Sequence, residues 1–539
     1  MDIKALRQKI LDLAIRGKLV PQDPNDEPAS VLLERIRAEK QQMVKDGKLK
    51  PKDIKNNTII FVGEDNLHYE KFQDGTVKCI EDEIPFELPE GWEWCRVRDI
   101  AAVKGGKRLP KGVGFSPCRT AHAYIRVTDM KNHCINTDDL KYISEEVFLQ
   151  IKNYTISKDD LYVTIAGTIG VTGEVPTELD GMNLTENAVK ITNIQINKNY
   201  LCLIIQSEFV QQQFQDKTHQ VAMPKLALER ILSTLIPVCT ITTQSAMVSK
   251  FVEMDSLINQ IREEKEILAE TVSLTKSKIL DLAIRGKLVP QNPDDEPASV
   301  LLERIRAEKE ELIKAGKIKR DKKESIIFKG DDNSYYENIS NNTICIDEEV
   351  PFDLPDGWIW CRLKSLADPH ENSFVDGPFG SNLKTDHYTD RREVRIIQLN
   401  NIGEFTWKNN GIKYTTYSHA ETLSRCKSYP GDIVIAKMMP AGRAIIIPDI
   451  EDVYVISSDC VRLQLPNYID KRYVMYMINS PTINKSVMKN VQGIGRTRTS
   501  LSKLKELLVP IPPYKQQCQI SATFDKSLFY FDTINALCE

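Results

Sequence analysis

Nonpolar side chains follow a helical spacing over residues 244–285, a stretch much longer than a typical globular helix. They alternate at intervals of four and three residues, interrupted only at Lys265 and Thr275, and this spacing is typical of the contact seam of a coiled coil. The seam residues are Met247, Phe251, Met254, Ile258, Ile261, Leu268, Val272, Ile279 and Leu282. The pattern predicts a coiled-coil helix of roughly 60 Å, and the alternative is a helix buried inside one globular core.

The two ends of the chain carry the same pattern in two pieces. Residues 517–539 contain the first piece and residues 1–16 the second, with seam positions at Ile520, Phe524, Phe531, Ile534, Ile3, Leu6, Ile10 and Leu13. Placed end to end, the two pieces correspond to nearly the whole of the long helix. We therefore expect them to run back along it, antiparallel, with the halves of the chain related by a pseudo-twofold internal repeat.

A segment of 32 residues occurs twice. Residues 9–40 and 278–309 are identical at 30 of these 32 positions. In each copy a proline precedes an amphipathic stretch and a glycine follows it, which predicts helices over 28–47 and 297–316. The identity has two interpretations: gene conversion of a helical segment, or two equivalent docking sites for two copies of one partner.

Similarity between the halves extends further, but unevenly. The residues EDEIPFELPEGWEWCRV at 81–97 correspond to DEEVPFDLPDGWIWCRL at 347–363. Residues 98–235 and 364–508, in contrast, share a pattern but few residues. Both are rich in Val, Ile, Thr and Tyr and are interrupted by Gly and Pro, so they predict irregular mixed sheets.

The expected fold class is α+β, with two mixed α/β domains separated by a long antiparallel coiled-coil helix pair. The polar stretches 48–80 and 317–346 predict loops with a short hairpin. The expected divisions are 1–50 for a helical region with the first repeat copy, 81–243 for the first mixed domain, 244–320 for the central coiled coil with the second copy, 347–513 for the second mixed domain, and 514–539 for a C-terminal helix that pairs with the central one.

Composition narrows the class of protein. The formal net charge is -4, so there is no overall basic bias. A nucleic-acid partner is still compatible with this charge, because binding depends on where the charges lie. The twelve cysteines include no CxxC pair, which is typical of a reduced cytosolic protein. No apolar run approaches the roughly 18 residues of a membrane helix. The first residues, MDIKALRQK, do not have the pattern of a signal peptide. We expect a cytoplasmic protein without membrane contact.

The sequence offers little catalytic chemistry. It has no phosphate-binding GxxxxGK[ST] motif. The residues PPY at 512–514 resemble the catalytic loop of amino-methyltransferases, but Ile511 stands where such a loop needs Asn or Asp, so we expect only a turn before a helix. Four residues could ligate zinc in principle, but the second half has no counterpart to them: Cys118, His122, His133 and Cys134. We expect no catalytic residue, no metal and no cofactor.

Basic residues cluster in Gly- and Pro-rich loops of both sheet regions. Glycine permits close backbone approach, and arginine can bind phosphate or read guanine. The candidates are Lys104, Lys107, Arg108 and Lys111 in the first region, and Lys384, Arg391, Arg392, Arg395, Arg496 and Arg498 in the second. Arg126 and Gln398 occupy matched positions, which fits two regions with different base preferences. The alternatives are solvated surface for the clusters and structural hydrogen bonds for the matched pair.

Motifs along the whole chain resemble those of the specificity subunits of type I restriction-modification enzymes. They are LPEGW (88–92), VKGGKRLPKG (103–112), YIRVTDM (124–130), LPDGW (354–358), DGPFGSNLK (376–384), GDIVIA (431–436) and VPIPPYKQQ (509–517). The repeated GKLVPQ…EPASVLLERIRAEK also occurs in that family. One departure is IPVCTITTQ in the first half, which lacks the double proline and leaves the start of the long helix less well defined.

The resemblance implies two target-recognition domains that each read one part of a split double-stranded DNA sequence. It also implies helical spacers that set the distance and hold two modification subunits, with restriction subunits joining the assembly. Methylation and cleavage would then belong to the partner chains, and this chain would not be an enzyme. The alternatives are a standalone DNA methyltransferase or nuclease, and a structural coiled-coil adaptor.

Overall fold

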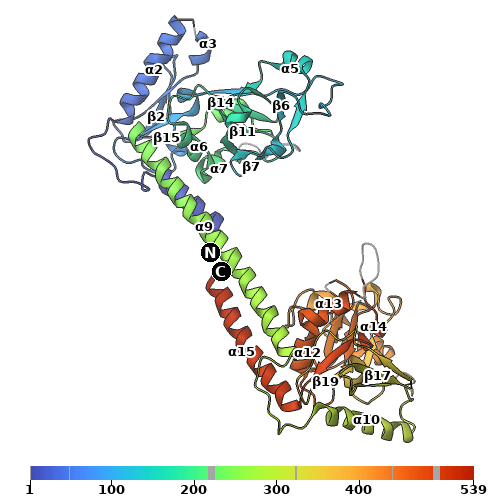
Figure 1. Ribbon diagram of the computed structural model, residues 1–539. Coiled ribbons are helices and arrows are strands. Elements are labelled where there is room, and N and C mark those ends of the chain that lie inside the picture. The colour runs from blue at the N-terminus through green and yellow to red at the C-terminus, as the bar shows by residue number, and fades with distance from the viewer. Residues whose placement is uncertain are drawn as a thin grey trace. The chain divides into compact units, whose positions relative to one another are not determined.

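The computed structural model describes residues 2–47, 49–215, 225–321, 324–340, 342–439, 441–489 and 498–538. The chain divides into two compact units, unit 1 (Met1–Glu264) and unit 2 (Lys265–Glu539). Each unit contains both helices and strands (Figure 1), so the predicted α+β class is confirmed. No helix in the described part of the chain is long and apolar enough to cross a membrane.

The predicted long helix is present as α9 (Ile241–Ile284), which has 44 residues and passes from unit 1 into unit 2. Its nonpolar seam is buried near both ends, for example at Phe251 and Val272. In the middle of the helix, Ile261 and Leu268 are exposed. The four-three spacing therefore predicted the helix correctly. The burial that it implies for the whole seam is found towards the two ends and not in the middle.

Two further helices cover the ends of α9. In unit 1, α1 (Ile3–Ile15) packs on the first part of α9, where Ile10 and Leu11 share a buried cluster with Phe251. In unit 2, α15 (Tyr514–Cys538) packs on the last part, and Phe524 shares a buried cluster with Ile284. The two chain ends thus form helices, as the pattern predicted.

The repeat copies contain α2 (Ala29–Lys45) and α10 (Ala298–Lys314), each of 17 residues. These helices were predicted, with bounds one or two residues wider at each end. Pro28 and Pro297 lie just before the first turn, where their extended backbone makes them the caps. Each helix buries the same four positions against its own unit: Ala29, Leu32, Leu33 and Ile36 in α2, and Ala298, Leu301, Leu302 and Ile305 in α10.

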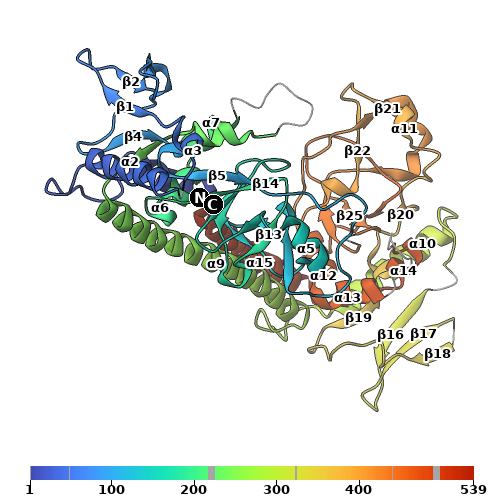
Figure 2. The same ribbon diagram turned by 90° about the horizontal axis from the view of Figure 1, so that it is seen from above.

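The predicted loops with a short hairpin are instead small three-stranded sheets. In unit 1, α3 (Pro51–Ile54) precedes β1 (Ile59–Val62), β2 (His68–Lys71) and β3 (Val77–Cys79), which pair antiparallel in the order β1-β2-β3. In unit 2 the equivalent strands are β16 (Ser325–Lys329), β17 (Tyr335–Ile339) and β18 (Asn342–Cys345), which form a separate sheet at the edge of the unit (Figure 2). Beside these sheets, β4 (Glu93–Arg96) pairs with β15 (Leu235–Val238), and β19 (Ile359–Arg362) with β29 (Leu508–Ile511).

The remainder of unit 1, here called reader 1, contains two four-stranded sheets. One has the antiparallel order β12-β11-β14-β5, and the other the mixed order β10-β13-β6-β9 with β13 parallel to β6. The strands are β5 (Ala102–Gly105), β6 (His122–Ile125), β9 (Lys141–Ile143), β10 (Thr155–Ile156), β11 (Leu161–Thr164), β12 (Thr172–Glu174), β13 (Met182–Leu184) and β14 (Ala188–Thr192), with a hairpin of β7 (Met130–Lys131) and β8 (Cys134–Ile135). The helices are α4 (Val97–Ile100), α5 (Glu145–Ile151), α6 (Lys198–Gln206), α7 (Glu208–Gln215) and α8 (Leu228–Leu232).

Reader 2, the equivalent part of unit 2, has the antiparallel order β20-β28-β25-β26 and the mixed order β21-β23-β22-β27-β24, with β22 parallel to β27. The strands are β20 (Phe374–Asp376), β21 (Tyr388–Thr389), β22 (Val394–Ile397), β23 (Tyr414–Thr415), β24 (Lys427–Ser428), β25 (Ile433–Ala436), β26 (Ala444–Ile446), β27 (Tyr454–Ile456) and β28 (Cys460–Leu463). The helices are α11 (Tyr417–Thr422), α12 (Lys471–Asn479), α13 (Pro481–Lys489) and α14 (Leu501–Lys505). The predicted irregular mixed sheets are therefore confirmed in both readers.

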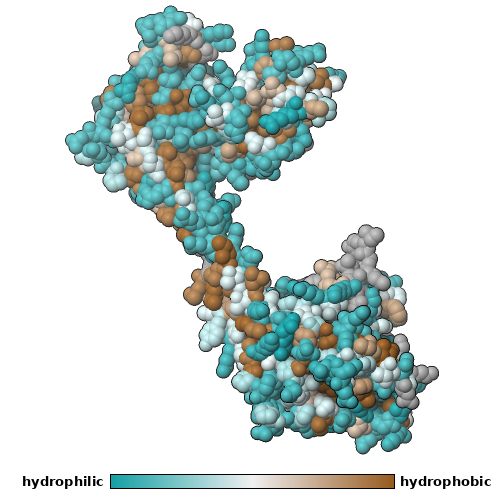
Figure 3. Space-filling view, in the orientation of Figure 1, coloured by the Kyte–Doolittle hydropathy of each residue, from teal (hydrophilic) through white to brown (hydrophobic). Residues whose placement is uncertain are grey.

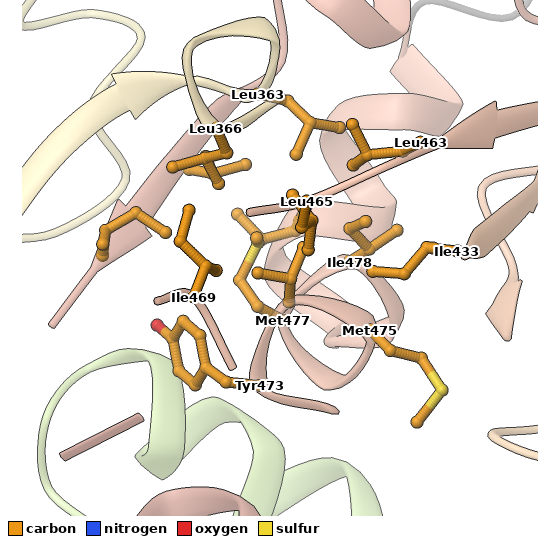
Figure 4. Packing of buried hydrophobic residues seen from close by; sticks show 14 of the residues in the cluster. Leu363, Leu366, Ile433, Leu463, Leu465, Ile469, Tyr473, Met475, Met477 and Ile478 are labelled. Atoms are coloured by element: carbon orange, nitrogen blue, oxygen red, sulfur yellow. The ribbon is translucent and has the colours of Figure 1, made fainter. Parts of the chain in front are cut away.

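The largest buried cluster lies in unit 2. Ile433 and Leu463 come from neighbouring strands, and Tyr473, Met477 and Ile478 come from α12 and pack against them (Figure 4). A corresponding cluster in unit 1 joins α6 to β11 and β14. The visible surface over both units is largely hydrophilic, with scattered hydrophobic residues (Figure 3). The two buried clusters pack beneath the strands whose ends carry the loops described below.

Candidate nucleic-acid interface

Four loops meet at one end of reader 1. The backbone N–H of Lys107, after β5, donates to Leu184 O (2.9 Å) at the end of β13. The N–H of Ile165, after β11, donates to Asn187 O (2.8 Å), and the N–H of Leu226, before α8, donates to Ile165 O (2.9 Å). Segments far apart in the sequence are thus held as one surface.

Reader 2 joins its equivalent loops in the same way. The N–H of Gly377, after β20, donates to Cys460 O (3.0 Å), and the N–H of Lys437, after β25, donates to Asp459 O (2.8 Å). The N–H of Thr499, before α14, donates to Lys437 O (2.9 Å). We call these two surfaces the loop ends of reader 1 and reader 2.

The first loop of each loop end needs glycine. A Cβ at Gly106 would lie 2.0 Å from Thr185 O, and one at Gly377 would lie 1.8 Å from Ser457 O. Any larger residue would push the loop away from the neighbouring one. The glycines of the two family motifs, VKGGKRLPKG and DGPFGSNLK, therefore set the geometry of the loop ends.

The predicted cluster of reader 1 is exposed throughout. Lys107 and Arg108 lie on its first loop, Lys104 lies on β5 and Lys111 lies farther along the loop. Arg108 Nε donates to Glu186 Oε1 (2.6 Å), and this hydrogen bond raises the pKa of the guanidinium above its ordinary value. An ion-paired arginine thus lies at this loop end, together with exposed lysines that can contact phosphate.

A further cation of this surface was missed from the sequence. Lys225 is exposed, and its Nζ donates to Glu186 O (3.2 Å), which brings it to the same loop end as Arg108. Its counterpart in reader 2 is Arg498, whose Nη2 donates to Ser458 O (2.9 Å). The match between LIPV (235–238) and LVPI (508–511) could have identified this pair, because both cations stand ten residues before the motif.

The predicted cluster of reader 2 is only partly brought together. Lys384 and Arg391 are exposed, and Arg392 Nε donates to Glu451 Oε1 (3.0 Å). Lys384 lies on the loop that follows Gly377, whereas Arg391 and Arg392 lie beside β22, in the other sheet. Arg496 lies outside the described residues.

Arg395 corrects the prediction. It lies on β22 with only 2% of its surface exposed. Its guanidinium stacks over the Trp407 ring (4.9 Å from the centroid), and Nη2 donates to Asn409 Oδ1 (2.5 Å). Burial against Trp407 therefore favours a structural role in the sheet over the predicted contact with DNA.

Arg126 and Gln398 do occupy the same place in the two readers. Each precedes a short 3-10 turn, and its backbone N–H donates to the side chain three residues later, Asp129 (2.8 Å) or Asn401 (2.9 Å). Arg126 also donates from Nη2 to Asp129 Oδ1 (2.6 Å) and to Asp139 O (2.7 Å). These internal bonds favour the structural interpretation for Arg126, while Gln398 stays a candidate for base contact.

Reader 2 exposes nonpolar side chains that the prediction did not include. Phe379 lies on the first loop, between Gly377 and Gly380, with 83% of its surface exposed. Met439 is exposed on the second loop. The equivalent of Phe379 in reader 1 is Arg108, from the alignment of the two glycine motifs. The loop ends thus share a backbone frame but present different chemistry.

The two histidines considered for zinc make other contacts, and the two cysteines, Cys118 and Cys134, are free and exposed. His122 bonds to Glu145 (2.5 Å) and stacks on Phe148, and His133 lies between Arg7 Nη1 (3.0 Å) and Thr172 O (3.0 Å). Among the described residues, no group of three or more His, Cys, Asp and Glu side chains is placed to hold a metal ion.

Known proteins resemble this chain over nearly its whole length. The EcoAI specificity subunit of Escherichia coli, a type I restriction enzyme component, is 28% identical over 97% of this chain and 88% of its own length. The EcoEI specificity subunit is 26% identical over the same shares. A chain in a solved structure on complex assembly and conformational transition of the type I R-M system matches with a TM-score of 0.54 at 15% identity, over 84% of this chain and 94% of that one.

The family described as "Type I restriction modification DNA specificity domain" matches residues 89–270 and 389–536. These two segments lie one in each half, include most of both readers and cover more than half of the chain. The chain therefore belongs to the type I restriction modification DNA specificity domain family.

Proposed function

We propose that this chain is the non-catalytic recognition subunit of a type I restriction-modification complex and reads a split double-stranded DNA target with the loop ends of its two readers. The observation that carries the proposal is one loop frame that occurs twice with different exposed side chains, such as Arg108 and Phe379. Cations on such loops bind phosphates, and their neighbours can reach base edges. Two unlike surfaces of this kind suit two unlike half-sites.

The alternatives are less well supported. A standalone methyltransferase or nuclease would need its own reaction centre, whereas the relatives are named as specificity subunits. A purely structural adaptor would have no need for two differing sets of loops. The subunit would work in the cytoplasm, where it meets chromosomal DNA.

The test is genome-wide methylation mapping in cells that carry this chain and its modification subunit. We expect methylation at one split sequence with two unlike halves and an unread gap. Cells that carry the modification subunit alone should lack it. Methylation that does not depend on this chain would contradict the proposal.

The partners belong to the same proposal: two modification subunits, and restriction subunits that join them. Part of the repeated segment serves its own unit, since Trp92 Nε1 donates to Gln22 (2.8 Å) and Trp358 Nε1 to Gln291 (3.0 Å). Other identical positions point outward, including Val31 and its equivalent Val300, which are exposed. These exposed positions support two equivalent docking sites.

Surface substitutions test the docking sites better than deletion of the helices, because α2 and α10 bury residues in their own units. Val31→Asp combined with Val300→Asp should weaken binding of the modification subunit, measured by the mass of the complex. The exposed Leu149→Asp is the control. Two modification subunits bound at unchanged affinity would remove these helices from the docking sites.

The antiparallel helix pair, the pseudo-twofold repeat and the domain boundaries inferred from the sequence complete the proposal. Support comes from the packing of α1 and α15 on the two end parts of α9. One extra heptad after Ile261 and another after Ile534 should lengthen the unread gap by ~10 Å, or about 3 base pairs. An unchanged gap in the methylated sequence would show that these helices do not set it.

A further inference from the structure

The small sheet of each unit exposes a nonpolar face. Strand residues alternate between the two faces of a sheet. In β1, Ile60 points inward to Trp94, and Phe61 points outward. In β16, Ile327 points inward to Trp360, and Phe328 points outward. Phe61 is 39% exposed and Phe328 is 43% exposed.

One outward row has the same three residues in both sheets. Across the three strands of unit 1, Phe61 pairs with Tyr69, and Tyr69 pairs with Cys79. Across those of unit 2, Phe328 pairs with Tyr336, and Tyr336 pairs with Cys345. The ring centroids are 5.9 Å apart in both pairs, with interplanar angles of 27° and 26°. Ile59 and Ile326 continue the face along the first strand.

The inner face of each sheet is held by a buried arginine–glutamate pair, to which a second, exposed glutamate is added. Arg96 on β4 donates from Nη2 to Glu70 Oε2 (2.8 Å) and from Nη1 to Glu83 Oε2 (2.9 Å). Arg362 on β19 bonds to Glu337 in the same way, and donates from Nη1 to Glu349 Oε2 (2.7 Å). The outward faces are therefore rigid and preorganised, which lowers the cost of binding a partner.

Identity at exposed positions needs a reason outside the fold. Core packing accounts for the inward residues, and exposed Phe and Tyr side chains are no benefit to an isolated unit in water. The row of Phe, Tyr and Cys is nevertheless identical in the two sheets. The next row on the same face differs, with Lys71 and Val77 in unit 1 where unit 2 has Asn338 and Thr343. A partner that binds both faces would account for this identity.

The charge at the rim indicates what that partner carries. The turn between the first two strands bears two exposed acids in each sheet, Glu64 and Asp65 in unit 1 and Asp331 and Asp332 in unit 2. Asp65 accepts a hydrogen bond from Tyr69 Oη (2.6 Å), and Asp332 accepts one from Tyr336 Oη (2.7 Å). A complementary surface is nonpolar at its centre and basic at this edge.

We propose that these two faces dock the modification subunit, one copy on each unit. This inference rests on the proposed function, which already assigns two copies of that partner to the chain. Two equivalent faces suit a partner present twice. In each unit the strands of the face follow, along the chain, the helix with the exposed Val31 or Val300.

The test counts modification subunits on the full-length chain by native mass measurement. Phe61→Ser and Phe328→Ser should each lower the occupancy of one of the two sites, and the double variant should lower the occupancy of both. We expect the dissociation constant of an altered site to rise roughly tenfold to a hundredfold. Tyr417→Ser, at an exposed aromatic residue of reader 2, should change nothing. Glu64→Lys with Asp331→Lys should also weaken binding, without touching the sheet packing.

Three results would overturn the inference. The double variant could retain two modification subunits at unchanged affinity. It could lose only a restriction subunit, which would assign the faces to that partner. The wild-type chain could pair with itself through these faces and become monomeric in the variants. Methylation mapping of the wild-type complex separates these results from a failure of the proposed function, because it reports target recognition directly.

Discussion

One backbone position is occupied by His133 in unit 1 and by Phe405 in unit 2, and both have a φ of 61°. His133 receives a hydrogen bond from Arg7 of α1 (3.0 Å), so a polar contact ties reader 1 to a terminal helix. Phe405 packs edge-on against Phe524 of α15 (5.5 Å between centroids), so a nonpolar contact does the same for reader 2. The two units thus have the same backbone conformation at this position and the same contact with a terminal helix, but the contact is polar in unit 1 and nonpolar in unit 2.

The loop ends extend this comparison. Arg108 and Phe379 stand at equivalent points of one loop frame, whereas the ion clusters of Arg96 and Arg362 have the same partners in both units. The ion clusters are the same in both units, whereas the exposed side chains at the loop ends differ. Separate changes to the ion clusters and to these side chains should therefore have separate consequences.

The largest loss of stability should come from breaking the ion clusters that the two units share. Arg362→Met leaves Glu337 buried without its cation, which costs about 3–5 kcal/mol of unfolding free energy; Arg96→Met should do the same to Glu70. Burial alone would raise the pKa of both carboxyls, but the adjacent arginine outweighs it and holds the pKa below its ordinary value. Their stabilising contribution is present above the unfolded pKa of about 4.3 and is lost as pH falls through the folded pKa.

Chemical denaturation of the full-length chain at pH 7 measures this loss. The exposed pair of Arg35 and Glu27 supplies the control, since Arg35→Met should change stability little. Similar losses of unfolding free energy in Arg362→Met and Arg96→Met would show that the ion cluster has the same role in both units. No loss in either would refute it.

Substitutions of the exposed side chains at the two loop ends should affect DNA binding in different ways. Phe379→Ala removes an exposed aromatic that can stack on or wedge between bases, and we expect target affinity to fall by the equivalent of ~1–3 kcal/mol. Arg108→Ala should instead lower the slope of log affinity against log salt by about one. Titration of the complex onto its mapped target at several salt concentrations distinguishes the two. An equal change of slope in both variants would contradict the distinction.

The smallest effect should be the pH response of His133. Because Thr172 O can only accept, Nδ1 carries the proton and Nε2 accepts from Arg7. Burial, and next the charge of Arg7, lower the pKa of His133 below 6.5. The unfolded chain then binds more protons just below pH 6.5, so the stabilising contribution is present above that pH and declines as pH falls to the folded pKa.

His133→Phe, which copies the residue of unit 2, should remove this part of the pH dependence. Thermal unfolding of the wild type and of the variant between pH 5 and 8 measures it. Matching pH profiles would mean that the Arg7 contact does not depend on the charge of His133.

The helices could be predicted from the sequence because their signals are local. Proline, nonpolar spacing and glycine follow one another within one stretch, as at Pro28 and Gly47. The third strand of each small sheet was not predicted, since β3 and β18 are short and fully exposed and lack the alternation that marks a strand.

The candidate site was harder because its contacts are nonlocal. The burial of Arg395 depends on Trp407, which a β-strand pattern cannot indicate. The approach of Lys225 to Glu186 depends on the paths of two loops far apart in the sequence. The glycine motifs did identify the first loop of each reader, because close backbone contact requires glycine at Gly106 and Gly377.

The most direct test of two independent readers is the exchange of one of them. Residues 364–508 are replaced by the reader of another family member, and the methylated sequence is mapped again. We expect one half-site to change while the other half-site and the length of the gap stay the same. A change in both half-sites, or in neither, would contradict the account.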